Sequence, residues 1–250
     1  MIIYHCVPKA ARRFIATHML RALPALRVRE YYEPMQLDTP QMGKAELSLL
    51  FEPADEPIQR FDHRRMQGFD FCFGVFSTRR FRKEPGDYSF TFLRHPLDRF
   101  YSGYYYGHHH IANGTEAVKD GSRSVRYRER FPEMVEFLGL DLKTYVARFI
   151  EGNGRIRFNR GGTVFGPIDE IFFYPTNLEA HDFVGIVEHM PRSLGILNDH
   201  LGTAIADGER INKGPVDKRE RIGEAELTRL FAKDIETFHR YEERLLKGRW

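Results

Sequence analysis

Two short segments of the sequence carry residue types that bind anions. "VPKAARRF" (7–14) follows an apolar run and contains Lys9, and "FLRHPLDRFYS" (92–102) places Arg94 ahead of Ser102. A lysine ammonium, an arginine guanidinium and the backbone N–H groups at the start of a helix all bind phosphate or sulfate groups. Together the two segments indicate a site for an anionic ligand.

The first segment has the position of a phosphate-binding loop. The sequence predicts a buried strand over "MIIYHCV" (1–7) and a helix over "RRFIATHMLRAL" (12–23), where apolar residues recur at helical spacing. A loop between them directs backbone N–H groups toward a bound anion, and Lys9 adds a point charge. The pattern G-x-x-x-x-G-K-[ST] is absent, so taken alone the segment is better explained as a surface loop that contains a lysine.

The second segment joins a strand to a helix. "YSFTFL" (88–93) predicts a strand, and a helix is predicted from about Pro96, because proline suits a first helical turn and Asp98 suits the positive end of the helix dipole. Arg94 then stands at the end of the strand and Ser102 about two helical turns into the helix. This spacing allows a guanidinium and a hydroxyl to converge on one phosphate.

The other predicted elements indicate an α/β fold. Strands are predicted over 69–76 and 182–189, and helices over 141–152, 191–202 and the amphipathic C-terminal stretch 223–246. The glycine-rich "GGTVFG" (161–166) is predicted to be a turn. Strands that alternate with helices predict a mostly parallel sheet covered on both faces. A length of 250 residues favours one domain over the whole chain, 1–250.

Composition excludes some classes of function. A net charge of +3 is too small to indicate a nucleic-acid partner, and no stretch reaches the ~18 apolar residues of a membrane span. The N-terminus lacks the pattern of a signal peptide, so a cytoplasmic location is expected. Cys6 and Cys72 lie in apolar strand-like runs and are expected to be buried free thiols.

Three consecutive histidines, "HHH" (108–110), invite a metal-site interpretation. Adjacent helical residues point about 100° apart, so three in a row do not form a metal-binding tripod. Partly protonated histidines suit the negative end of a helix dipole, and the sequence favours a helix C-terminus there.

The segments resemble the sulfotransferases that use 3′-phosphoadenosine 5′-phosphosulfate (PAPS). The similarity is greatest to the carbohydrate group typified by heparan sulfate and chondroitin/dermatan 2-O-sulfotransferases. It covers "VPKAA" (7–11), "FLRHPLDRFYSGYYY" (92–106), "DFVGIVEHMPRSLGIL" (182–197) and "INKGP" (211–215). The resemblance implies a P-loop-type sulfotransferase fold, with a central parallel sheet flanked by helices. It also implies transfer of a sulfuryl group from PAPS to a hydroxyl, expected to be on a carbohydrate.

The resemblance also implies which residues bind PAPS. In that family the first loop binds the 5′-phosphosulfate, and the pattern R-x-P-x-x-R-x-x-S binds the 3′-phosphate of PAPS and of the product, 3′,5′-adenosine bisphosphate. The corresponding residues here are Lys9, Ala10, Ala11, Arg12, Arg13, Phe14, Arg94 and Ser102, with Asn212 and Lys213 expected to close over the nucleotide. No metal is expected, because a cation such as Lys9 stabilises the bridging oxygen of the leaving group.

The chain departs from the family pattern at two places. The positions that the family fills with Thr, small residues and hydroxyls are here Ala10, Ala11, Arg12, Arg13 and Phe14, so hydroxyl contacts to the phosphosulfate are lost and its binding is left to backbone N–H groups. Val75 stands where relatives carry the histidine that acts as general base. His63 is the first candidate for a replacement base, followed by Asp62 and Glu33.

These departures leave other functions open. One is a non-catalytic nucleotide-binding protein that serves as a sensor or scaffold. A kinase of related fold is disfavoured, because Ala10 occupies the position of the magnesium-binding hydroxyl.

Overall fold

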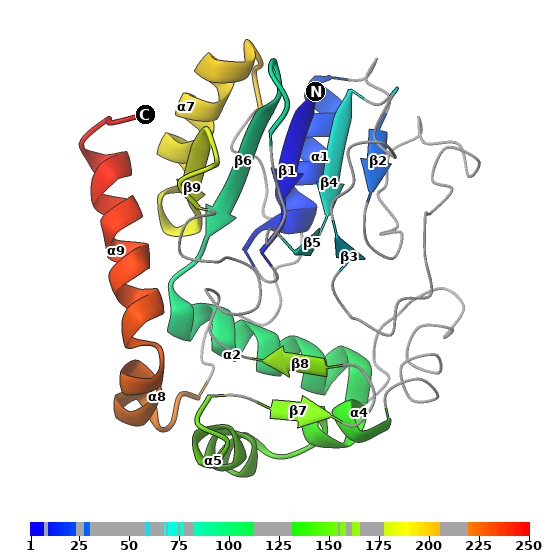
Figure 1. Cartoon of the computed structure of the whole chain (residues 1–250). Helices are drawn as coiled ribbons and strands as arrows, with labels where there is room; N and C mark the ends of the chain where they lie inside the picture. The colour runs from blue at the N-terminus through cyan, green and yellow to red at the C-terminus, as the bar shows by residue number, and fades with distance from the viewer. Residues whose placement is uncertain are drawn as a thin grey trace.

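The centre of the protein is a five-stranded sheet in which every neighbouring pair of strands is parallel (Figure 1). The computed structural model describes residues 1–7, 10–23, 28–30, 59–60, 68, 70–74, 76–77, 83–112, 132–154, 156–158, 162–165, 178–205 and 220–250. The strands lie in the order β2-β4-β1-β6-β9, with bounds Val28–Glu30, Phe71–Gly74, Ile2–His5, Tyr88–Leu93 and Phe183–Ile186. The α/β class predicted from the sequence is confirmed.

The strands β4, β6 and β9 are short, largely apolar runs because a parallel sheet is covered on both faces. All four residues of β4 and of β9 are buried, as are the last five of β6. Gly185 of β9 lies opposite Phe92 of β6, and a Cβ atom at Gly185 would stand 2.5 Å from the Phe92 ring. The close approach of this ring requires glycine at that position.

Three helices pack with the sheet into one apolar cluster. They are α1 (Arg12–Ala22), α7 (Met190–Leu201) and α9 (Ala232–Leu246). In Figure 1, α1 passes behind β1 and β4, while α7 and α9 lie beside β9. The buried face of α1 consists of the apolar residues that recur in its sequence, including Phe14, Ile15 and Met19.

A second apolar cluster lies beyond the carboxyl ends of the strands (Figure 1). Its helices are α2 (Pro96–Tyr106), α4 (Pro132–Leu138), α5 (Leu142–Glu151) and α8 (Glu224–Leu230). Asp141 caps α5, because its carboxylate accepts a hydrogen bond of 2.9 Å from the Thr144 N–H. The helix predicted from the sequence for this segment is confirmed.

Two element predictions are wrong. The stretch 161–166 is not a turn, because β8 (Gly162–Phe165) pairs antiparallel with β7 (Ile156–Phe158). The C-terminal helix is not continuous, because Phe231 ends α8 and precedes α9. The Phe231 side chain packs between Phe100 and Phe149 in the second cluster, whereas Phe238 of α9 packs in the sheet cluster. Because of this break, the amphipathic stretch 223–246 packs its apolar residues into both clusters.

The remaining elements are short. β3 (Gln59–Arg60) pairs with β5 (Phe76–Ser77), and a 3₁₀ turn, η4 (Val187–His189), follows β9. Cys6 and Cys72 are buried free thiols, as the sequence predicts. Within the described ranges, no helix combines the length and apolarity needed to cross a membrane.

Candidate functional site

The sheet topology selects one place for a ligand. From β1 the chain continues through α1 to β2 on one side of the sheet, and from β6 it continues through α2 toward β9 on the other side. β1 and β6 are neighbours, so the segments that follow them diverge from a common point. In open parallel sheets ligands bind at the carboxyl ends of the strands, at such a topological switch point. The first two sequence motifs follow these two strands.

The start of α1 presents backbone N–H groups to this point. Ala10 N–H donates to the Val7 carbonyl at 3.1 Å, and the first bond within the helix runs from Ile15 N–H to the Ala11 carbonyl at 3.0 Å. The N–H groups of residues 12–14 therefore lie at the open end of the helix, where the helix dipole favours an anion.

Side chains of the first loop contribute less than its backbone. The Ala10 side chain is fully buried, and the Tyr4 hydroxyl donates to the Ala10 carbonyl at 3.4 Å. Phe14 is 7 % exposed and packs against His18. Ala10 is thus fully buried with its N–H and carbonyl bonded within the protein, and it offers no group to a ligand. Phe14 can contact a ligand only through its backbone.

Ala11 adopts an unusual conformation for its residue type. Its φ of 60° and ψ of 20° lie in the left-handed region, which costs a non-glycine residue about 1–2 kcal/mol. Residues held in such regions cluster at ligand-binding sites. Here the conformation turns the chain out of the Val7 turn and into α1.

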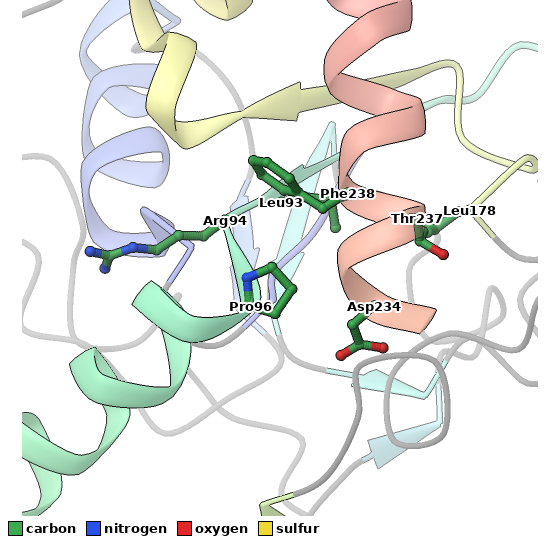
Figure 2. Close-up of a pocket in the computed structure, with 7 residues that line it drawn as sticks. All are labelled: Leu93, Arg94, Pro96, Leu178, Asp234, Thr237 and Phe238. Atoms are coloured by element: carbon green, nitrogen blue, oxygen red, sulfur yellow. The ribbon is translucent and has the colours of Figure 1, made fainter. Parts of the chain in front are cut away.

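Arg94 follows β6 at the same edge of the sheet and is half-buried. Figure 2 shows its side chain extending away from Phe238 and Asp234, which stand on α9. The Arg94 guanidinium therefore points away from α9, which is compatible with an anion-binding role at the sheet edge.

Glu188 holds the turn that carries Arg94. Its Oε1 accepts a hydrogen bond of 2.9 Å from the His95 N–H, the residue that precedes α2. Burial raises the pKa of the Glu188 carboxyl, while the His95 N–H and the Arg94 charge oppose that shift. Glu188 was not predicted to belong to the site. The available signal was its position just beyond β9, the strand that neighbours β6.

Arg99 has a different role from Arg94, although both stand in the same motif. Its Nη2 lies 4.0 Å from Oδ2 of Asp234, and the two side chains are 12 % and 1 % exposed. Burial lowers the pKa of Arg99, while the Asp234 and Tyr145 charges oppose this shift. Arg99 thus joins α2 to α9 inside the protein.

Ser102 lies on the second turn of α2 and is half-buried. It follows Pro96 by six residues, about 9 Å along the helix axis. Ser102 and Arg94 both belong to the segment at the carboxyl edge of the sheet, and their convergence on one phosphate stays a prediction.

The residues from Glu220 to Ile222, which follow the "INKGP" segment (211–215) in sequence, are bonded to α2. The Tyr105 and Tyr101 hydroxyls donate to the Glu220 and Ile222 carbonyls, each at 2.7 Å, and Arg221 pairs with Asp98. The residues that begin the last described part of the chain therefore contact α2, the helix that carries Ser102.

Several predicted site residues lie outside the described residues. These are Lys9, Glu33, Asp62, His63, Val75, Asn212 and Lys213, and the side chains of Arg12 and Arg13. Their roles stay predictions.

The three histidines continue α2 as a π-helix, Gly107–Ala112. His108 Nδ1 lies 3.0 Å from the Leu138 carbonyl, and its ring stacks on Tyr104. Among described residues no group of three or more His, Cys, Asp or Glu side chains has a metal-binding arrangement. His108 therefore serves contacts within the second cluster.

A small cavity of about 10 Å³ lies between the turn after β6 and α9. Figure 2 shows the residues that line it, Leu93, Arg94, Pro96, Leu178, Asp234, Thr237 and Phe238. This volume is about enough for one water molecule, so the cavity is too small for a nucleotide. The candidate site is instead the open edge at the ends of β1 and β6.

Comparison of the chain with family models, curated proteins and solved structures finds no match.

Proposed function

We propose that the protein transfers a sulfuryl group from PAPS to a hydroxyl acceptor, in a fold of the P-loop sulfotransferase type. The observation that supports this most is the parallel pairing of β1 with β6. It brings the start of α1 and the segment of Arg94 and Ser102 to one sheet edge, in the order in which the resembled family binds the 5′-phosphosulfate and the 3′-phosphate. The acceptor class, a carbohydrate, rests on the resemblance alone.

The residues have complementary tasks in this proposal. The N–H groups of residues 12–14 bind the 5′-phosphosulfate, and Lys9 stabilises the charge on its bridging oxygen. Arg94 and Ser102 bind the 3′-phosphate. Attack by the acceptor oxygen forms a new S–O bond, breaks the S–O bond to the phosphate, and releases 3′,5′-adenosine bisphosphate. The acceptor proton passes to a base, for which His63 is the proposed group.

Nucleotide binding without transfer is the second candidate. Val75 favours it, because a valine side chain cannot accept a proton. Both candidates need the same nucleotide site, and only the first needs a base.

Calorimetric titration with 3′,5′-adenosine bisphosphate, AMP and ATP tests the site. The proposal predicts selective binding of the bisphosphate, lost in Arg94→Ala and kept in Arg148→Ala, a control at an exposed arginine of α5. Binding of ATP in preference, or of none of the three, contradicts the proposal. A screen of carbohydrate acceptors with labelled PAPS then separates transfer from binding alone, and His63→Ala tests the base.

A further inference from the structure

A second cationic surface lies far from the candidate nucleotide site. A groove of about 450 Å³ is lined by Glu179 and by residues of the C-terminal stretch, Arg240, Tyr241, Glu243, Arg244, Lys247 and Arg249. Figure 1 shows the C-terminal end of α9 at the end of the sheet opposite to α2. None of the lining residues belongs to β1, α1, β6 or α2, so the groove is a separate site.

The groove carries more positive than negative charge. Arg240, Arg244 and Lys247 follow one another at spacings of four and three residues, so they share one face of α9, and Arg249 adds a fourth cation. Cations in the last turn of a helix are explained by the helix dipole. Arg240 lies near the middle of α9, beyond the reach of that effect, and faces the same groove.

The carboxylate that these arginines share is poorly placed to satisfy both. Glu179 lies 3.9 Å from the Arg240 guanidinium and 3.6 Å from that of Arg244. Charge-assisted hydrogen bonds between such groups are normally about 2.7–2.9 Å. Glu179 Oε1 also accepts a bond of 2.9 Å from the Tyr241 hydroxyl, which fixes the carboxylate. An external oxyanion can therefore make closer contacts with both guanidiniums than Glu179 does.

Arg244 is also held in place before any ligand binds. Arg244 Nε donates to the Arg249 carbonyl at 2.9 Å, and its guanidinium lies 4.0 Å above the Trp250 ring. The Arg240 guanidinium lies over the Tyr241 ring. Trp250 in turn packs against Tyr241 and against Phe183 of β9. Such preorganisation lowers the entropy lost when a ligand binds.

From this geometry we infer that the groove binds a small molecule bearing a phosphate or sulfate monoester. The planar guanidinium groups of Arg240 and Arg244 match the oxygens of a tetrahedral oxyanion. The groove volume falls within the range of about 300–1,000 Å³ that is usual for small-molecule sites. This leaves room for an organic group beside the anion.

Trp250 is the only tryptophan of the chain and lies directly under Arg244, so its fluorescence reports on this groove. The protein is titrated with glucose 6-phosphate and with inorganic sulfate, with sodium chloride at matched ionic strength as the reference. We expect the Trp250 fluorescence to change in a saturable way with at least one of the two probes. In Arg240→Gln the affinity for that probe should be at least about tenfold lower. Tighter binding of glucose 6-phosphate than of sulfate shows that the organic part is also held.

Two variants separate this site from other effects. Arg229→Gln removes an exposed arginine of α8 and should leave binding unchanged. Arg94→Ala should also leave it unchanged, so that failure of the proposed nucleotide site does not affect this test. A fluorescence change that only follows ionic strength, or that is equal in Arg240→Gln and the unaltered protein, overturns the inference.

Discussion

The two helix starts at the edge of the sheet, those of α1 and α2, differ in how their positive dipole ends are balanced. α2 has Asp98 in its first turn, and Glu188 accepts the N–H of the residue before the helix. The first turn of α1 contains Arg12 and Arg13 but no acidic residue, and Ala11 has no side-chain group that can cap the helix. The start of α2 thus has two carboxylates of the protein beside it, whereas the sequence of the first turn of α1 offers basic residues and no acidic ones.

This difference bears on the proposed anion site. Two arginines near a positive helix end are unfavourable unless a bound anion compensates them. At α2 the carboxylates already fulfil that role, and the cation Arg99 is paired internally with Asp234. This contrast supports the proposal that an external anion binds at the start of α1, beside the strand end that carries Arg94.

The largest expected effect concerns the internal pair of α2. Asp234→Ala removes the carboxylate that lies beside the buried Arg99 guanidinium, which should lower the free energy of unfolding by about 3–5 kcal/mol. Urea denaturation measures this loss. The double variant Arg99→Met with Asp234→Leu should recover most of it. Unchanged stability in Asp234→Ala would show that α2 does not depend on this pair.

The next effect concerns the hydrogen bond that Glu188 accepts from the His95 N–H, just before α2. Glu188→Ala removes this hydrogen bond, which lies at the surface, and should cost about 0.5–1.5 kcal/mol of unfolding free energy. Glu188→Gln keeps an acceptor oxygen and is the matched control. Thermal unfolding of both variants tests the role of the hydrogen bond, and equal losses in the two would contradict it.

The stability of Glu188→Gln relative to the unaltered protein should depend on pH. Because burial raises the pKa of Glu188 in the folded state, ionisation of this carboxyl destabilises the fold as the pH rises through that pKa. Glu188→Gln should therefore be at least as stable as the unaltered protein at neutral pH. The advantage should vanish near pH 4, where the carboxyl is protonated. An advantage that grows as the pH falls would contradict the assigned direction.

Reversing a charge at α1 should make its start resemble that of α2. Arg13→Glu places a carboxylate in the first turn and should weaken binding of 3′,5′-adenosine bisphosphate about tenfold, equivalent to about 1.4 kcal/mol. Arg148→Glu makes the same change in net charge at an exposed position of α5. Calorimetry compares the two variants, and equal weakening would indicate a nonspecific charge effect.

The smallest expected effect concerns the turn before α1. Ala11→Gly removes the left-handed strain and should raise the free energy of unfolding by less than about 1 kcal/mol, since glycine also loses more entropy on folding. Ala11→Val should destabilise the protein instead. A destabilising Ala11→Gly substitution would show that the alanine methyl group matters more than the backbone strain.

Local sequence signals sufficed for much of this fold. The apolar runs of β1 and β6, the Asp141 cap and Gly202 after α7 identify their elements because the relevant interactions lie within a few residues. The break at Phe231 could not be predicted, because no glycine or proline marks it. It follows from the packing of one helical stretch against two separate apolar clusters.

The same limit applies to the candidate site. Arg94 and Ser102 could be proposed from the sequence because their motif is continuous, whereas the burial of Ala10 and Phe14 follows from the packing of α1 against the sheet. Glu188 and Asp234 lie far along the chain from the groups they contact, so their contributions emerge only when the strands and helices are assembled. The pairing of Arg99 with Asp234 is likewise a property of the tertiary structure.

Hydrogen exchange measured by mass spectrometry, with and without 3′,5′-adenosine bisphosphate, tests the central claim most directly. Binding at the ends of β1 and β6 predicts slower exchange in peptides covering 10–15 and 94–103, and no change in peptides covering 240–250. Slower exchange confined to other segments, or none at saturating nucleotide, would contradict the assignment of the site.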